Sequence, residues 1–189
     1  FSGILTYFLT PEQFITADVG QQVYAASAES LKRICADLGL SDRRVYVTTG
    51  NAVGETGTTS WLFIPESNKT SVPAPTDLET GFIIEDGARG LSVRPTGSGL
   101  FTAFERSLTE SLGTTPDTLC AQLSNAVIED FELADKANFD TDSNDGRASV
   151  QLTDVVYDDS NQFDQPVVSL FAVGLSAGLN TQVEATVTE

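Results

Sequence analysis

The sequence contains no histidine. Without an imidazole, the chain cannot build a Ser-His or Cys-His nucleophilic pair, and it lacks a common ligand of transition metals. Cysteine is also scarce: Cys35 and Cys120 stand in separate apolar helical patterns with no C-x-x-C spacing. We expect two buried free thiols, although sequence spacing leaves a disulfide between them open. A catalytic site would have to use carboxylates, Lys, Tyr or a thiolate.

Positive charge is scarce as well, with 10 Lys and Arg against 27 Asp and Glu and a formal net charge of −17. Basic residues are adjacent only at Lys32-Arg33 and Arg43-Arg44, so there is no basic stripe for phosphates, and no nucleic-acid partner is predicted. At molar salt the Debye length falls to about 3 Å, which removes most of the self-repulsion. The composition favours a high-salt cytoplasm over an ordinary acidic surface.

No apolar run is long enough to cross a membrane. The apolar segment Phe1–Leu9 would span only about 14 Å as a helix, and it has no charged flank or cleavage pattern of a signal peptide. It is either a buried first turn or the end of a longer transmembrane helix, and the Phe at position 1, where a Met is usual, favours the second. We therefore expect an apolar stub at residues 1–9 and a single soluble domain at residues 10–189.

Apolar periodicity predicts about four helices. The first begins at Thr10-Pro11, with a capping box completed by Gln13, and ends near Leu38 before Gly39. Two more follow over residues 100–112 and from Thr115-Pro116 to Phe131. The last, from Pro166 to about Leu179, is apolar on all sides and is expected to be buried.

β-rich runs predict about seven short strands, at residues 45–49, 61–64, 81–84, 91–94, 131–140, 147–152 and 183–187. Residues 65–80 carry three prolines among polar residues and indicate an irregular surface loop. Hairpin signals outnumber β-helix-β crossovers. The expected architecture is therefore a single α+β (or α/β) domain with a mostly antiparallel sheet.

A candidate anion site lies between a predicted strand and helix, at Arg94, Gly97, Ser98 and Gly99. Backbone N–H groups at a helix start can receive an anion, and the arginine could assist. The pattern lacks the third glycine of a dinucleotide-binding loop and the Gly-Lys-Ser/Thr of a phosphate loop. The competing and preferred interpretation is a structural turn with Ser98 as the N-cap.

A candidate calcium site would use Asp140, Asp142 and Asn144. The glycine of this loop, Gly146, falls one position late, and position twelve is Gln151 where a bidentate Glu is needed. A hairpin turn with Gly146 at positive φ is the preferred interpretation. No metal and no cofactor is therefore predicted.

Five segments together resemble a family of uncharacterised haloarchaeal membrane-associated proteins: Leu5–Phe14, Leu38–Val47, Leu62–Pro65, Arg94–Gly97 and Phe163–Leu175. The similarity extends over essentially the whole chain. It implies that a coiled coil and hydrophobic spans precede this domain, which would lie on the cytoplasmic face of the membrane and reach it through segments upstream of Phe1. The resemblance implies no activity and no catalytic motif.

Three functions follow from these observations. The leading hypothesis is a non-enzymatic sensory or interaction module, with a protein partner or a second copy as its ligand. The alternatives are a small-ligand or anion-binding domain and a carboxylate-dependent enzyme. A pocket with converging Asp or Glu would favour the enzyme, and an exposed apolar patch would favour the interaction module.

The charge predicts that folding depends on salt. Because added salt screens the repulsion among the excess carboxylates, the melting temperature should rise steeply from low salt to molar KCl. Thermal unfolding followed by circular dichroism measures this directly. An unchanged melting temperature over that range would contradict adaptation to high salt.

Overall fold

The computed structural model describes residues 17–49, 59–85, 87–142, 144–156 and 162–188. Within these ranges the chain forms four α-helices: α1 (Ala17–Asp37), α2 (Ser98–Ser107), α3 (Pro116–Asn125) and α4 (Pro166–Leu179). It also forms seven strands: β1 (Val45–Thr49), β2 (Thr59–Pro65), β3 (Phe82–Ile83), β4 (Gly90–Val93), β5 (Lys136–Asp142), β6 (Arg147–Thr153) and β7 (Val183–Glu184). All of their pairings are antiparallel, which confirms a single α+β domain.

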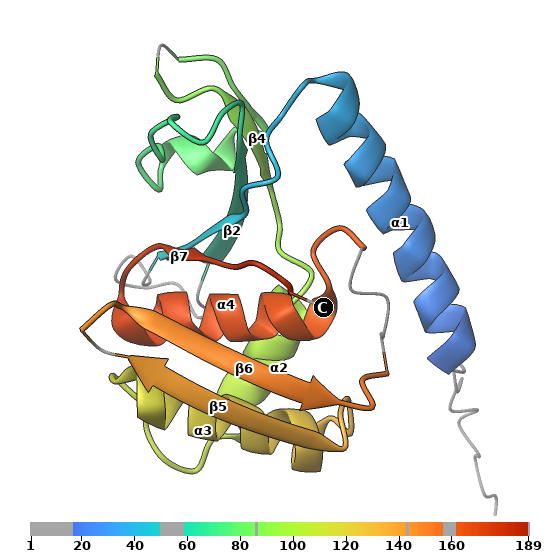
Figure 1. Ribbon diagram of the computed structural model, residues 1–189, viewed down its shortest axis with the longest axis vertical. Helices are drawn as coiled ribbons and strands as arrows, with labels where there is room; N and C mark the ends of the chain where they lie inside the picture. The colour runs from blue at the N-terminus through green and yellow to red at the C-terminus, as the bar shows by residue number, and fades with distance from the viewer. Residues whose placement is uncertain (1–16, 50–58, 86, 143, 157–161, 189) are drawn as a thin grey trace, which may run out of the picture.

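The strands form two sheets (Figure 1). Five of them make the larger sheet in the order β3-β4-β2-β1-β7, in which Val45 pairs with Phe63 and Leu62 pairs with Val93. The other two, β5 and β6, form a separate hairpin that contacts α3. Gly146 has φ of +62° in the turn of this hairpin, as the sequence predicted.

Helix α4 is the centre of the domain. It contacts β1 and β7 of the large sheet on one side and α2 and α3 on the others (Figure 1). Because helix α4 has no charged residue and is buried along nearly its whole length, it has no face suited to water. Its predicted bounds and its burial are both confirmed.

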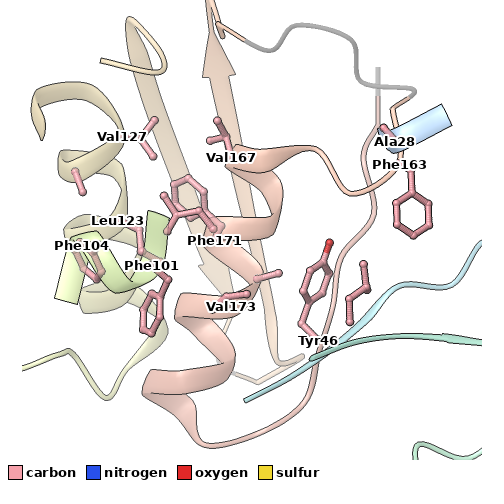
Figure 2. Close-up of a cluster of buried hydrophobic side chains, with 14 of the residues drawn as sticks. Ala28, Tyr46, Phe101, Phe104, Leu123, Val127, Phe163, Val167, Phe171 and Val173 are labelled. Atoms are coloured by element: carbon pink, nitrogen blue, oxygen red, sulfur yellow. The ribbon is translucent and has the colours of Figure 1, made fainter. Parts of the chain in front are cut away.

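The main core fills the space between the sheet and the helices (Figure 2). Phe101 and Phe104 of α2 meet Leu123 of α3, and Phe171 enters the same cluster from α4. All four side chains are at most 5% exposed. Burying each large apolar side chain contributes roughly 1.5–3 kcal/mol to stability, so this cluster is a principal source of folding free energy.

The opposite face of the sheet is covered by the segment between β2 and β3. This segment was predicted as an irregular surface loop, and it is mostly irregular, but it includes a 3-10 turn at Asp77–Glu79. Leu78 of that turn is fully buried and packs with Phe63 and Ile83, while Ser92 Oγ donates a hydrogen bond of 2.7 Å to the Leu78 carbonyl. The segment therefore forms a second, smaller core.

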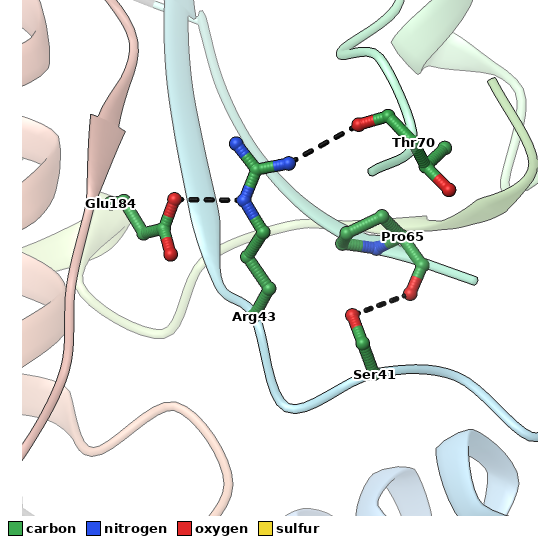
Figure 3. Close-up of polar contacts among 5 residues, drawn as sticks. All are labelled: Ser41, Arg43, Pro65, Thr70 and Glu184. Carbon is green, nitrogen blue, oxygen red and sulfur yellow. Dashed lines mark hydrogen bonds and ion pairs between the residues drawn. The ribbon is translucent and has the colours of Figure 1, made fainter. Parts of the chain in front are cut away.

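Arg43 ties three segments together (Figure 3). Its Nε lies 2.8 Å from a carboxylate oxygen of Glu184 in β7, and its Nη1 donates to the carbonyl of Thr70. Nearby, Ser41 Oγ donates to the Pro65 carbonyl at the end of β2. Arg43 thus links β7 to the segment that covers the sheet.

Several predicted boundaries differ from the structure. The strand predicted at 131–140 begins only at Lys136, because α3 first widens into a π-helical turn at Ala126–Asp130 and the chain then turns back through Glu132 at positive φ. The last strand, predicted at 183–187, is only Val183–Glu184, where β7 pairs with the start of β1. Gly20 lies inside α1 without ending it, and Gly39, at φ +65°, follows the helix end as predicted.

The predicted helix start at Thr10-Pro11 and the apolar stub at residues 1–9 lie outside the described residues. Within the described part of the chain, no helix combines the length and the apolar character needed to cross a membrane.

The close approach of the start of α2 to α4 can be tested by substitution. A Cβ on Gly97 would lie 2.3 Å from the backbone nitrogen of Leu170, whereas a Cβ on Gly99 would meet nothing within 4 Å. Gly97→Ala should therefore destabilise the protein by about 3 kcal/mol, because it forces two backbones apart. Gly99→Ala, inside α2, should stabilise it by about 0.5–1 kcal/mol through lower unfolded-state entropy.

Chemical denaturation of both variants at one salt concentration measures the two effects. Equal stabilities of the Gly97→Ala variant and the wild type would contradict the close approach of α2 and α4.

Candidate functional site

A cluster of four polar side chains lies where α4 begins, and three of the four are buried. Its members come from separate elements: Tyr46 from β1, Thr96 from the β4–α2 connection, and Asp164 and Ser169 from the start of α4. We call these four residues the polar junction. Asp164 is only 6% exposed, and Tyr46 and Ser169 are still more buried.

Asp164 accepts hydrogen bonds through both carboxylate oxygens. The hydroxyl of Tyr46 donates to Oδ1 at 2.7 Å, and the backbone N–H of Thr96 donates to Oδ2 at 2.6 Å. The hydroxyl of Thr96 also donates to the Asp164 carbonyl. The backbone of Asp164 has φ of +52°, which is strained for most residues but tolerated by Asp and Asn.

The connection extends into the first turn of α4. Ser169 Oγ accepts a hydrogen bond of 2.9 Å from the Gly97 N–H, and Gln165 caps the helix by accepting from the Val168 N–H. Just before Asp164, the carbonyl of Phe163 accepts from the hydroxyl of Tyr24 in α1. The segment 163–169 therefore binds α1, β1 and the start of α2 simultaneously.

Burial controls the ionisation of the junction. Desolvation raises the pKa of Asp164 above its ordinary value, while hydrogen bonds from Thr96, Tyr46 and Ser169 oppose that rise. The pKa of Tyr46 is raised well above its ordinary value, first by burial and then by the charge and hydrogen bond of Asp164. The tyrosine is therefore a hydrogen-bond donor and is not ionised at neutral pH.

The hydrogen bonds of the polar junction join separate elements of the fold. Both oxygens of Asp164 receive donors from the protein itself, so the carboxylate is committed to holding elements together. Within the residues that the structure describes, no three His, Cys, Asp or Glu side chains are grouped to hold a metal ion. Each oxygen of the Asp164 carboxylate thus has a donor from the protein itself.

The two cysteines are buried free thiols, as predicted. Burial is the main cause that raises the pKa of each thiol; at Cys35 the charge of Arg44 opposes the rise, and at Cys120 the charge of Asp117 adds to it. Because the thiolate is the reactive form, a raised pKa makes both poor nucleophiles at neutral pH.

Arg44 lies next to the polar junction. Its guanidinium stacks over the ring of Phe163, with 4.8 Å from its central carbon to the ring centroid. Its Nη1 is buried and, among the described atoms, has no hydrogen-bond partner. A buried donor of this kind favours a small anion as a ligand, at a position that the sequence did not indicate.

The residues of the predicted anion site are mostly engaged elsewhere. Arg94 stacks over Trp61 at 4.2 Å and donates to the Ser60 carbonyl, and the Gly97 N–H bonds to Ser169. Ser98 is the first residue of α2 and not its N-cap, because Gly97 holds that position; the Ser98 hydroxyl is buried without a partner among the described atoms. Gly99 follows inside the helix.

The residues of the predicted calcium loop form a hairpin turn. Asp142 Oδ1 accepts from the backbone N–H groups of Asn144 and Asp145, which caps the turn. Asp140 lies in β5 with an exposed side chain. This arrangement is the turn that the sequence favoured over a metal site.

The polar junction was missed by sequence reasoning. The sequence pattern places Asp164 only in the segment that leads into α4, and it predicts Tyr46 as a strand residue that either packs in the core or lines a pocket. The available signal was an acidic residue directly before an entirely apolar helix, where a charge must either leave the core or find partners.

Large apolar side chains are exposed along α1 and at the edge of the large sheet, and singly at Phe139, Val156 and Val187. Along α1, the side chains of Val19, Val23, Ile34 and Leu38 are 40–64% exposed, and we call these four the α1 row. At the edge of the large sheet, Phe82 and Ile84 are 58% and 76% exposed. Exposed apolar groups of this kind mark interaction surfaces.

The polar junction generates a prediction about pH. Because its folded pKa is raised, Asp164 contributes stability that is complete below pH about 4 and is lost as the pH rises through the folded pKa. Asp164→Asn keeps an acceptor for the Thr96 N–H and tolerates positive φ, but it cannot ionise. The variant should therefore gain stability relative to wild type from pH 4 to 7.

Unfolding free energies of both proteins across this pH range provide the test. Asp154→Asn is the matched control for backbone conformation, because Asp154 also has φ of +52° but an exposed side chain. At pH 4, Asp164→Ala should lose about 3 kcal/mol, since it leaves the Tyr46 hydroxyl and the Thr96 N–H without their acceptor. Parallel curves for wild type and Asp164→Asn would contradict the raised pKa.

Comparisons with known proteins extend the sequence resemblance to a defined family. No curated protein and no solved structure matches the chain. The family described as a domain of unknown function, DUF7982, matches residues 1–189, which is the whole of the sequence. This chain therefore belongs to the DUF7982 family.

Proposed function

We propose that this domain is a non-enzymatic interaction module whose docking surface is the α1 row. The observation that carries the proposal is the contrast between the inside and the outside of the molecule. The buried carboxylate of Asp164 is hydrogen-bonded on both oxygens, whereas the apolar side chains of α1 are exposed to solvent. Exposed apolar groups gain free energy when a partner covers them.

The position of α1 supports this assignment. The helix lies at the outer edge of the domain and packs through one face only, with Ala28 and Cys35 buried and Tyr24 and Leu31 half-buried (Figure 1). The α1 row lies beside that face, so a partner can cover it without disturbing the core. The other exposed apolar pair, Phe82 and Ile84, belongs to a strand of only two residues and its neighbour, which is a smaller platform.

The proposal includes the membrane association and the high-salt cytoplasm that the sequence predicted. A membrane-associated protein would present this module at the cytoplasmic face, in a high-salt cytoplasm where screening allows acidic surfaces to approach. A small-anion ligand is the second candidate, favoured by the unpaired Nη1 of Arg44.

In-cell photo-crosslinking tests the interaction function. A photo-reactive amino acid placed at Val23 should give a defined adduct, and Ile34→Asp in the same chain should remove it. The matched control is the same amino acid at Asn138, an exposed polar position of β5, which should give none. The proposal fails if Val23 and Asn138 behave alike, or if a substrate screen finds turnover that Asp164→Asn abolishes in the folded protein.

A further inference from the structure

We propose that two copies of this chain associate through α1, with the two helices antiparallel across a twofold axis that passes between Ser27 and Ser30. The inference rests on the interaction function proposed above and identifies its partner as a second copy.

The α1 row is symmetric about its own midpoint. Ser27 and Ser30 fill the gap in the middle of the row. With them included, each residue follows the previous one by three or four positions, so both serines lie on the same side of the helix as the row. Val23 precedes Ser27 by four residues and Ile34 follows Ser30 by four. Val19 precedes Ser27 by eight and Leu38 follows Ser30 by eight. Leu38 continues the helical pattern, because its N–H donates to the Ile34 carbonyl at 3.0 Å.

This symmetry is what a twofold interface requires. In such an interface, when one residue meets a second residue of the other copy, the second also meets the first. Antiparallel helices would place Val19 against Leu38 and Val23 against Ile34 at both ends. The apolar side chains then meet one another at both ends of the contact.

The centre of the row permits close approach. Ser27 Oγ donates to the Val23 carbonyl at 3.1 Å, and Ser30 Oγ donates to the Ala26 carbonyl at 2.9 Å. Both hydroxyls therefore have partners within their own helix and need none from the other copy. Because Ser27, Ser30 and Ala26 are small, the helix axes can approach each other most closely at the twofold axis.

Charge identifies α1 as a surface where two copies can meet. The helix carries three acidic residues and two basic ones, so its formal charge is −1, whereas the chain carries −17. Arg33 and Asp37 pair within the helix at 3.8 Å, which leaves little net field beside the row. Association through other, strongly acidic surfaces would bring like charges together.

The spacing also argues against a parallel coiled coil. A coiled coil needs apolar positions that alternate three and four residues apart over several heptads. The spacing here is four, four, three, four and four, which on average exceeds both the 3.5 of a heptad repeat and the 3.6 of a straight helix. The row therefore runs obliquely across the helix surface and suits one short crossing. The row is about 28 Å long, so the contact would be a small interface.

Sedimentation velocity in molar KCl over a range of protein concentrations tests the association. The wild type should form a reversible dimer, and Val23→Asp and Ile34→Asp should each weaken it at least about tenfold, because each buries a charge at both ends of the contact. Ile84→Asp is the matched control at an exposed apolar position outside α1, and it should leave the affinity unchanged.

Disulfide trapping tests the orientation. Val19→Cys mixed with Leu38→Cys should yield a disulfide between the two variants, whereas each variant alone should yield none, since its two new thiols would lie about 28 Å apart in the antiparallel pair. A disulfide formed within each single variant would overturn the antiparallel arrangement. The unmodified protein controls for Cys35 and Cys120, which are buried.

The outcomes separate this inference from the proposed function. A purified protein that stays monomeric, or a dimer that Val23→Asp and Ile34→Asp leave intact, overturns the self-association. If Val23 then still gives a crosslink to a different protein in cells, the interaction function stands with another partner. If Val23 gives no crosslink and the protein is monomeric, both proposals are refuted.

Discussion

The carboxylate of Asp164 holds the first turn of α4 in place, and the rest of the domain is built around that helix. Tyr46 of β1 donates its hydroxyl to one carboxylate oxygen. Thr96, just before α2, donates its backbone N–H to the other. A carboxylate that is almost fully buried would be costly if either donor were missing. The same contacts therefore specify one orientation of the helix, because a shifted α4 would leave the carboxylate unpaired.

Helix α4 needs polar contacts to fix its position, because it has no polar face of its own. Apolar packing alone allows α4 to slide or rotate at little cost, since its side chains are interchangeable in chemistry. Three polar contacts remove that freedom: Asp164 at the start, Ser169 with the Gly97 N–H, and Ser176 with the Thr48 N–H. The close approach of Gly97 to the backbone of α4 then fixes the depth at which α2 packs.

The surface differs from the interior in that charge and exposed apolar side chains, and not buried hydrogen bonds, distinguish its parts. Acidic residues strongly outnumber basic ones in the chain as a whole, while α1 is nearly neutral and carries exposed apolar side chains. The proposed interaction function rests on this division and on the internal partners of the buried carboxylate. The symmetry of the α1 row adds that the same surface can serve as its own partner.

The sequence alone determined the existence of the helices and most strands, the antiparallel pairing and the burial of α4, because these depend on local periodicity and turn chemistry. Only the tertiary structure showed that Asp164 meets Tyr46 and Thr96, which lie 118 and 68 residues away, and that Ser98 is not the cap of α2. It also decided where β5 begins, since the π-helical turn after α3 overrides the apolar pattern from Phe131. Contacts between distant residues depend on how whole elements pack, and local pattern carries no record of that packing.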